Sequence, residues 1–149
     1  MPDVLLDTSF LLPTLGVDIE EISSEDLETM REVSGRTAFC CCHVSFVEIL
    51  GLIGRSGRVD RQTVSTGIKS LLESKTYKWI NPSSNAIQLA LELRAKGHKD
   101  NIDNILYSTA VDSRMLFLSL DHELKKFLRR NGYDTDLIVG VKDLAGRVQ

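Results

Sequence analysis

Two apolar runs in this chain end on an aspartate. Residues 4–6 lead into Asp7, and residues 115–120 lead into Asp121. Each run has the composition of a buried strand, and ligands of open α/β sheets bind outside the carboxyl ends of the strands. Two strands that deliver carboxylates to that edge indicate a shared acidic site. A divalent cation is the simplest means of holding such like charges together, so the pattern favours metal-dependent phosphate chemistry.

Three further acids are candidates for the same site. Glu48 lies among apolar neighbours on an expected helix, where a buried glutamate needs a partner. Asp100 and Asp103 precede another apolar helical run. Each acid has a purely structural alternative: Glu48 could pair with a basic residue, and the aspartates could cap or begin helices, where the helix dipole favours negative charge. The number of acids expected at one sheet edge favours the metal site.

Strand patterns alternate with helical patterns along the whole chain. Strands are expected at 3–7, 37–42, 77–80, 115–120 and 137–140, and helices at 8–15, 24–34, 44–54, 60–74, 83–96, 102–114 and 122–131. The alternation predicts an α/β fold, with a parallel sheet covered by helices on both faces. The 44–54 helix is apolar nearly all round, which predicts that it is largely buried. With 149 residues and neither linker nor repeat, we expect one domain over residues 1–149.

The charge of the chain argues against nucleic-acid binding by electrostatics alone. Its formal net charge is −3, close to balanced. Basic residues nevertheless gather in two clusters, one of Arg55, Arg58 and Arg61 and one of Lys125, Lys126, Arg129 and Arg130. The second cluster begins one helical turn after Asp121, so it is the better candidate for a basic rim beside the acidic site, with His98 and Lys99 next. A solvated helix face is the alternative for both clusters.

The cysteines and the hydropathy of the chain indicate the cellular compartment in which the protein is expected. Cys40, Cys41 and Cys42 are consecutive, and neighbours on a strand point to opposite faces, which disfavours a disulfide. We interpret them as reduced, buried thiols rather than as a zinc site; a catalytic thiol is the alternative. No apolar stretch approaches the roughly 20 residues that span a bilayer, and no signal-peptide pattern is present. These features predict a soluble cytoplasmic protein without a membrane partner.

The chain resembles a known family, the PIN-domain nucleases, named for their likeness to the N-terminal part of PilT. Four segments carry the resemblance, in the order of the family: Leu6-Asp7-Thr8-Ser9, Ser45-x-x-Glu48, Asp103-x-x-Leu106-x-x-Thr109-Ala110, and Ser119-Leu120-Asp121. Each motif is weak alone, but the ordered set is fairly specific and extends over nearly the whole chain. The resemblance implies a three-layer α/β/α sandwich with a five-stranded, mostly parallel sheet.

The resemblance also implies an activity, the Mg²⁺- or Mn²⁺-dependent hydrolysis of single-stranded RNA. Asp7, Glu48, Asp103 and Asp121 would be its catalytic and metal-binding acids. Asp7 and Asp121 would bind the metal directly, and Glu48 and Asp103 through water or by orienting the attacking water. Thr8 and Ser119 would support them, and Asp100 is the alternative to Asp103 as third ligand. Lys125, Lys126, Arg129 and Arg130 would hold the RNA backbone.

The partners and the rival functions remain open at this stage. The chain would be an RNA-processing enzyme or the toxin of a toxin–antitoxin pair, in which case a small antitoxin is its partner, and a homo-oligomer (dimer or tetramer) is expected. One or two metals are possible. A non-catalytic PIN-like scaffold is one rival. Another is a phosphoacceptor signalling domain, which needs a paired acid beside the first aspartate; the first strand offers none, although Lys142 follows the last strand.

Overall fold

The centre of the molecule is a parallel sheet whose strands all end at the same edge. The computed structural model describes residues 2–148. Its strands are β1 (Val4–Leu6), β2 (Phe39–Cys42), β3 (Lys78–Ile80), β4 (Leu116–Leu118) and β5 (Ile138–Val139). They form one five-stranded sheet in the order β3-β2-β1-β4-β5, and every pairing is parallel. The expected parallel α/β sheet is confirmed, with strands one to three residues shorter than the sequence pattern predicts.

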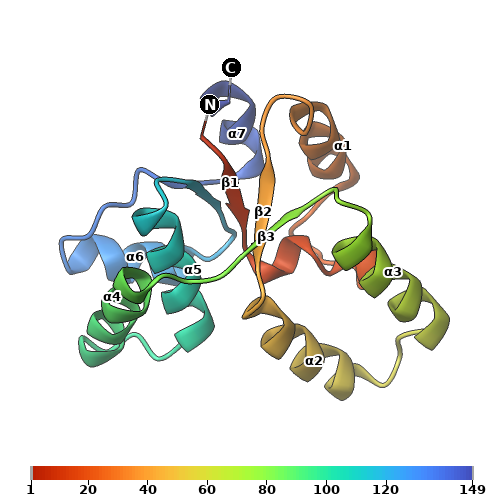
Figure 1. Cartoon of the computed structure of the whole chain (residues 1–149), viewed down its shortest axis with the longest axis horizontal. Helices are drawn as coiled ribbons and strands as arrows, with labels where there is room; N and C mark the ends of the chain where they lie inside the picture. Colours follow the sequence, from red (N-terminus) through yellow and green to blue (C-terminus); the bar gives the residue numbers. More distant parts are fainter. Residues whose placement is uncertain (1, 149) are drawn as a thin grey trace.

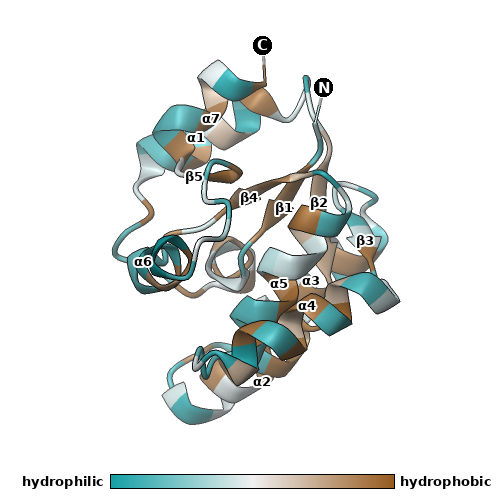
Figure 2. Ribbon diagram, turned by 90° about the vertical axis from the view of Figure 1, so that its left-hand side faces the viewer, coloured by the Kyte–Doolittle hydropathy of each residue, from teal (hydrophilic) through white to brown (hydrophobic). Residues whose placement is uncertain are grey.

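Helices cover both faces of this sheet (Figure 1). They are α1 (Ser24–Val33), α2 (Ser45–Ser56), α3 (Arg61–Glu73), α4 (Ser84–Ala95), α5 (Asn101–Asp112), α6 (His122–Arg130) and α7 (Val141–Arg147). Alternate strand residues point to opposite faces. Leu5 and Phe117 therefore pack with α4, α5 and α6, while Leu6 and Leu118 pack with the layer that contains α1, α3 and α7. The strands at the centre of the sheet are largely coloured as hydrophobic in Figure 2.

The segment after β1 departs from the expected helix over 8–15. It consists of two short 3₁₀ helices, η1 (Thr8–Phe10) and η2 (Pro13–Leu15). Pro13 has no N–H to donate to the carbonyl four residues earlier, so a continuous α-helix cannot pass through it. Gly16 ends the second turn with φ of 80°, in the left-handed region. The turn nevertheless begins directly after Asp7, which fixes this acid at the sheet edge.

The expectation that the 44–54 helix is largely buried is wrong. Of α2, only Ser45 and Ile49 are fully buried, whereas Val47 and Leu50 are 65% and 69% exposed. The helix starts at the carboxyl edge of the sheet and projects beyond it (Figure 1), so its first turns pack while its outer face meets solvent. Apolar composition on all sides of a helix indicates burial only when other elements surround it.

The C-terminal helix α7 is absent from the sequence expectations. It has seven residues, with Val141 and Leu144 buried against the α1 side of the core, and Val148 follows as the next buried residue. The spacing of these three residues, i, i+3 and i+7, is a helical pattern that could have revealed the segment. Its brevity and its Gly146 hide that signal.

A close approach of α3 to the chain after β1 requires a glycine. A Cβ added to Gly67 would lie 2.5 Å from the carbonyl oxygen of Thr14 and 2.8 Å from the Cδ2 of Leu15. Both positions belong to η2, so the backbone of α3 rests directly on the 3₁₀ segment. Leu71 on the same helix is buried in the core below.

No helix within residues 2–148 is long and apolar enough to cross a membrane. The three cysteines are free thiols with no exposed surface, as the sequence predicts. Burial raises the pKa of Cys40 to about 11 and raises the pKa of Cys41 further. Thiolates, the reactive form, are therefore scarce at neutral pH, which argues against the alternative of a catalytic thiol.

The burial of the three thiols predicts that they react with a thiol reagent only after the chain unfolds. The native protein should release almost no thionitrobenzoate from Ellman's reagent at pH 8, because the reagent reaches only exposed thiolates, whereas the guanidinium-unfolded chain should titrate three thiols. Rapid labelling of one thiol in the native state would contradict the burial of the β2 strand.

Candidate metal and active site

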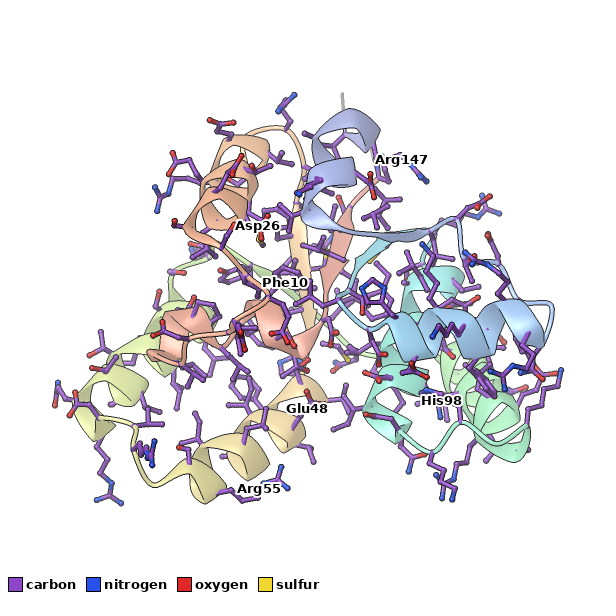
Figure 3. All side chains as sticks on the ribbon, turned by 180° about the vertical axis from the view of Figure 1, so that it is seen from behind. Phe10, Asp26, Glu48, Arg55, His98 and Arg147 are labelled. Atoms are coloured by element: carbon purple, nitrogen blue, oxygen red, sulfur yellow. The ribbon has the colours of Figure 1, made fainter. Side chains whose placement is uncertain are left out.

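Six carboxyl groups from distant parts of the chain line one cavity at the carboxyl edge of the sheet. The cavity has a volume of about 300 Å³ and is lined by the acids Asp7, Glu21, Glu48, Asp100, Asp103 and Asp121, together with Ser9 and Leu120. Asp7 follows β1 and Asp121 follows β4, while Glu48 lies in the first turn of α2 (Figure 3) and Asp100 and Asp103 begin α5. The edge therefore gathers all five acids that the sequence singled out.

Asp7 is the most deeply held of these acids. It is 6% exposed, its Oδ1 accepts a hydrogen bond from the backbone N–H of Thr8 at 2.7 Å, and its Oδ2 accepts one from the hydroxyl of Ser119 at 3.1 Å. Burial raises the pKa of Asp7 to about 6, against the lowering effect of these two bonds, and the charges of Asp121 and Asp100 raise it further. Asp7 thus has a fixed orientation and a costly negative charge.

Ser119 joins two of the acids. Its hydroxyl donates to Asp7 and accepts a hydrogen bond from the backbone N–H of Asp121 at 3.1 Å. The Oδ1 of Asp121 accepts from the N–H of Leu124 at 3.0 Å, which makes Asp121 the N-cap of α6. One buried hydroxyl therefore sets the spacing between the acids that follow β1 and β4.

A second hydroxyl pair ties α2 to the same edge. The hydroxyl of Thr8 donates to that of Ser45 at 3.0 Å, and both residues are completely buried. Ser45 is the first residue of α2, so this bond positions the turn that carries Glu48. Burial raises the pKa of Glu48 to about 7, and the charges of Asp7, Asp100 and Asp121 add to the effect. Thr8 supports the site from below; its hydroxyl is directed to Ser45.

Glu48, Asp100 and Asp103 form the tightest group of acids. Each offers a carboxylate oxygen, and these three oxygens lie within 4.8 Å of one another. Asp100 is the N-cap of α5, because its Oδ1 accepts from the N–H of Asp103 at 3.0 Å. Asp103 does not cap the helix, so its side chain is free to enter the cavity, where it is 7% exposed. Both aspartates therefore lie in the site, although the sequence left a choice between them.

Asp103 and Asp121 interact directly. Burial raises the pKa of Asp103 well above its ordinary value, and a hydrogen bond to Asp121 raises it further. The pKa of Asp121 is lowered, because the hydrogen bond from Asp103 and those from the start of α6 outweigh its own burial. Without a cation, the Asp103–Asp121 pair therefore favours a state in which the two carboxyl groups hold one proton between them.

Not every expected residue lies at the cavity. Lys125 and Arg129 line a different cavity, and neither Lys126 nor Arg130 lines either one. His98 is close enough to lower the pKa of Asp121, and its Nδ1 hydrogen-bonds to the Oδ1 of Asn104 at 2.7 Å. Sequence reasoning assigned no role to Asn104 or to Glu21. Glu21 lies in an acid-rich loop whose pattern gives no sign of its position, whereas Asn104 follows the Asp103 motif directly.

Solved structures share this architecture. One chain of the VapBC2 complex from Rickettsia felis, bound to a DNA fragment from its promoter, superposes with a TM-score of 0.64 at 10% identity, over 92% of this chain and 96% of the other. A toxin–antitoxin complex from Klebsiella pneumoniae gives 0.60 at 14% identity, over 93% and 98%. A protein from Pyrobaculum aerophilum gives 0.62 at 19% identity, over 99% and 89%. No protein-family model and no curated protein matches the sequence.

The chain has the PIN fold. The expected three-layer sandwich is therefore confirmed, and the PIN resemblance holds at the level of the fold. At identities of 10–19% the likeness concerns the fold alone, so the chemistry of this PIN fold rests on its own acids.

The raised pKa values predict how the metal-free protein responds to pH and to loss of one acid. Asp7 and Glu48 bind protons more readily when the chain is folded, so their contribution to stability should fall as pH rises from about 4 through 7, and the raised pKa of Asp103 extends the decline above pH 7. Asp103→Asn removes the cost of protonating a buried acid and should raise Tm in EDTA at neutral pH, at about 2–4 °C per kcal/mol. Differential scanning fluorimetry measures both effects.

The same measurement with Mn²⁺ tests whether Asp103 is a metal ligand or only a structural residue at the start of α5. A cation that binds only the folded state stabilises it, and Asp103→Asn should shrink that stabilisation. Asp18→Asn, a change at an exposed acid outside the cavity, is the matched control. It should change neither the Tm in EDTA nor the rise in Tm that Mn²⁺ causes. If Asp103→Asn lowers Tm in EDTA and leaves the Mn²⁺ shift unaltered, Asp103 is a structural residue and Asp100 becomes the better ligand candidate.

Proposed function

We propose that residues 1–149 form a single PIN-like nuclease domain, a metal-dependent endoribonuclease that hydrolyses phosphodiester bonds of single-stranded RNA. The observation that carries this proposal is the convergence of six acids on one cavity. Within residues 2–148 no lysine or arginine forms an ion pair with any of them. Buried like charges without a counter-charge are costly, so a cation that binds there is the natural complement.

The donor set fits Mg²⁺ or Mn²⁺. All the donors are carboxylate oxygens, which hard divalent cations prefer, and the site is half-open, which leaves room for water and substrate phosphate oxygens. Glu48, Asp100 and Asp103 would be the central ligands because their oxygens lie closest together. Asp7 and Asp121 would complete the set, directly or through water. Such a cation, when bound, lowers the pKa of a water molecule and neutralises charge on the phosphate.

The remaining tasks fall to the side chains of the site. Glu48 would also orient the attacking water. As the water oxygen bonds to phosphorus, the bond from phosphorus to the leaving ribose oxygen breaks. Ser119 would hold Asp7 and Asp121 in register, and Thr8 would hold α2 through Ser45. Of the four basic residues expected on α6, Lys125 and Arg129 would supply the positive charge that attracts the backbone, because they line a cavity, whereas Lys126 and Arg130 lie outside it.

The rival reading as a non-catalytic scaffold has less support. A scaffold has no need of acids whose negative charges are raised in energy by burial, and such positions would be replaced by amides or apolar residues at no loss. A phosphoacceptor domain is likewise disfavoured, because the sequence neighbours of Asp7, Leu6 and Thr8, supply no paired acid at the end of the first strand.

Solved structures of the same fold support a proposal about the partner of this chain. Three of them come from VapBC or toxin–antitoxin complexes, so we extend the proposal to a toxin that acts in the cytoplasm with a small antitoxin as its partner. An adjacent reading frame for a small DNA-binding protein would support this role over RNA processing.

We also propose that the protein is a homo-oligomer. Exposed apolar side chains on α2 and α4, namely Val47, Leu50, Ile87 and Leu91, leave surface that a second copy would cover. Light scattering after gel filtration should therefore give the mass of a dimer or tetramer of the 16.6 kDa chain. A monomer at micromolar concentration would refute the homo-oligomer.

The activity itself is tested with purified protein. It should cleave a single-stranded RNA in the presence of Mn²⁺ or Mg²⁺ and not in EDTA, since the cation supplies both the nucleophile and the charge neutralisation. Asp7→Asn should reduce the rate by orders of magnitude, because the amide removes a charge at the metal. The variant should still fold, since the amide oxygen can accept from Thr8 and the amide N–H can donate to Ser119.

The control for this experiment is Asp18→Asn, prepared in parallel. Its rate should equal that of the parent. Equal cleavage by parent and Asp7→Asn would reveal a contaminating nuclease or a different site. Absence of cleavage by the parent on RNAs of varied sequence would favour the scaffold.

A further inference from the structure

A second, larger cavity lies between α6 and α7, over the edge strand β5. Its volume is about 500 Å³, and it shares no lining residue with the acidic cavity. Its floor includes Ile138 and Val139 of β5. Sequence patterns did not predict this groove, because one of its walls is the unexpected helix α7.

Positive charge dominates the walls of the groove. Four cations line it, Lys125 and Arg129 from α6 and Lys142 and Arg147 from α7, against two acids, Asp136 and Asp143. None of the three ion pairs found within residues 2–148 uses a cation of the groove. Arg147 is held by a hydrogen bond from its Nη2 to the backbone carbonyl of Asp136 at 3.1 Å. The groove thus offers an excess of cations without paired carboxylates.

The groove divides the basic cluster of α6 into two pairs. Lys125 is partly buried and lies one helical turn before Arg129, so both reach the groove. Lys126 is exposed and forms an ion pair with Glu123 at 3.6 Å, and Arg130 is exposed outside the groove. The two pairs have equal charge on the same helix, which makes one a matched control for the other.

Helix α6 links the groove to the acidic cavity, because its N-cap Asp121 lines the cavity and its Lys125 and Arg129 line the groove. Both α6 and α7 start at the carboxyl edge of the sheet, after Asp121 and Gly140 respectively, so Lys125 and Lys142 lie toward that edge. At 1.5 Å per residue, Lys125 is about 6 Å and Arg129 about 12 Å along the helix axis from Asp121. Arg147 marks the far end, on the last turn of α7 and well separated from Glu48 (Figure 3).

We propose that the α6–α7 groove binds backbone phosphates of the RNA strand outside the bond that is cleaved, and so guides the strand into the acidic cavity. The inference rests on the proposed function and adds Lys142 and Arg147 to the substrate-binding residues. Lysine and arginine bind phosphate through charge-assisted hydrogen bonds, and a chain of phosphates matches cations spread along a groove better than one small anion does.

Binding of a fluorescein-labelled 12-nucleotide oligouridylate, followed by fluorescence anisotropy with Mn²⁺, tests the groove. The Asp7→Asn background prevents cleavage. Lys125→Ala/Arg129→Ala and, separately, Lys142→Ala/Arg147→Ala should each weaken binding about tenfold and reduce the salt slope by about 0.7 per lost phosphate contact. Lys126→Ala/Arg130→Ala should change the Kd less than threefold. Lys142→Glu, at an exposed position, repeats the test in a protein that keeps the hydrogen bond of Arg147 to Asp136.

The outcomes separate the groove from the proposed function. If the parent cleaves RNA while both α7 variants bind like the Lys126/Arg130 control, the groove proposal is wrong and the nuclease stands. If the parent neither binds nor cleaves RNA, both fail. A 12-base-pair DNA duplex is the second probe: weakening of duplex binding by Lys142→Glu as large as that for oligouridylate would mark a general polyanion surface and overturn the assignment to single-stranded RNA.

Discussion

Carboxylates repel one another, and yet six of them line the acidic cavity. This constraint organises the structure around it. Asp7, Glu48, Asp100, Asp103 and Asp121 gain nothing from their proximity without a cation, and burial makes their charges more costly still. Other interactions must therefore hold them in place. The parallel sheet provides the frame, since β1 and β4 pair directly and end side by side. Two buried hydroxyl contacts, from Ser119 to Asp7 and from Thr8 to Ser45, fix the local geometry.

Helix capping and the proposed metal binding prove to be compatible roles rather than alternatives. Asp100 and Asp121 each use one carboxylate oxygen to accept from a backbone N–H at the start of a helix. That bond immobilises the side chain at the carboxyl edge of the sheet and leaves the second oxygen for another partner. The positive ends of the helix dipoles also offset part of the accumulated negative charge. A cap at such a position therefore contributes to a candidate site at the same time as it starts a helix.

The sequence predicted the sheet and the gathering of acids because both depend on local patterns. Apolar runs that stop at Asp7 and Asp121 identify strand ends, and the alternation of strands and helices implies that those ends share an edge. What it could not predict depends on packing between distant segments. The exposure of Val47 and Leu50 depends on where α2 leaves the sheet, and the position of Glu21 depends on a loop without periodicity. The basic groove required α7, whose seven residues give too short a pattern to stand out.

The contact between α3 and η2 extends the demands of the site to a residue that never meets it. No side chain of α3 lines the acidic cavity, yet the bare Cα of Gly67 leaves the space that the Thr14 carbonyl and Leu15 occupy. A single methyl group there would push against the 3₁₀ segment, which follows Asp7 in the chain. Such a chain would retain every acid of the cavity and still lose their alignment. Gly67 acts as a spacer, and a lesion at this position would resemble an active-site defect while every residue of the cavity remained unchanged.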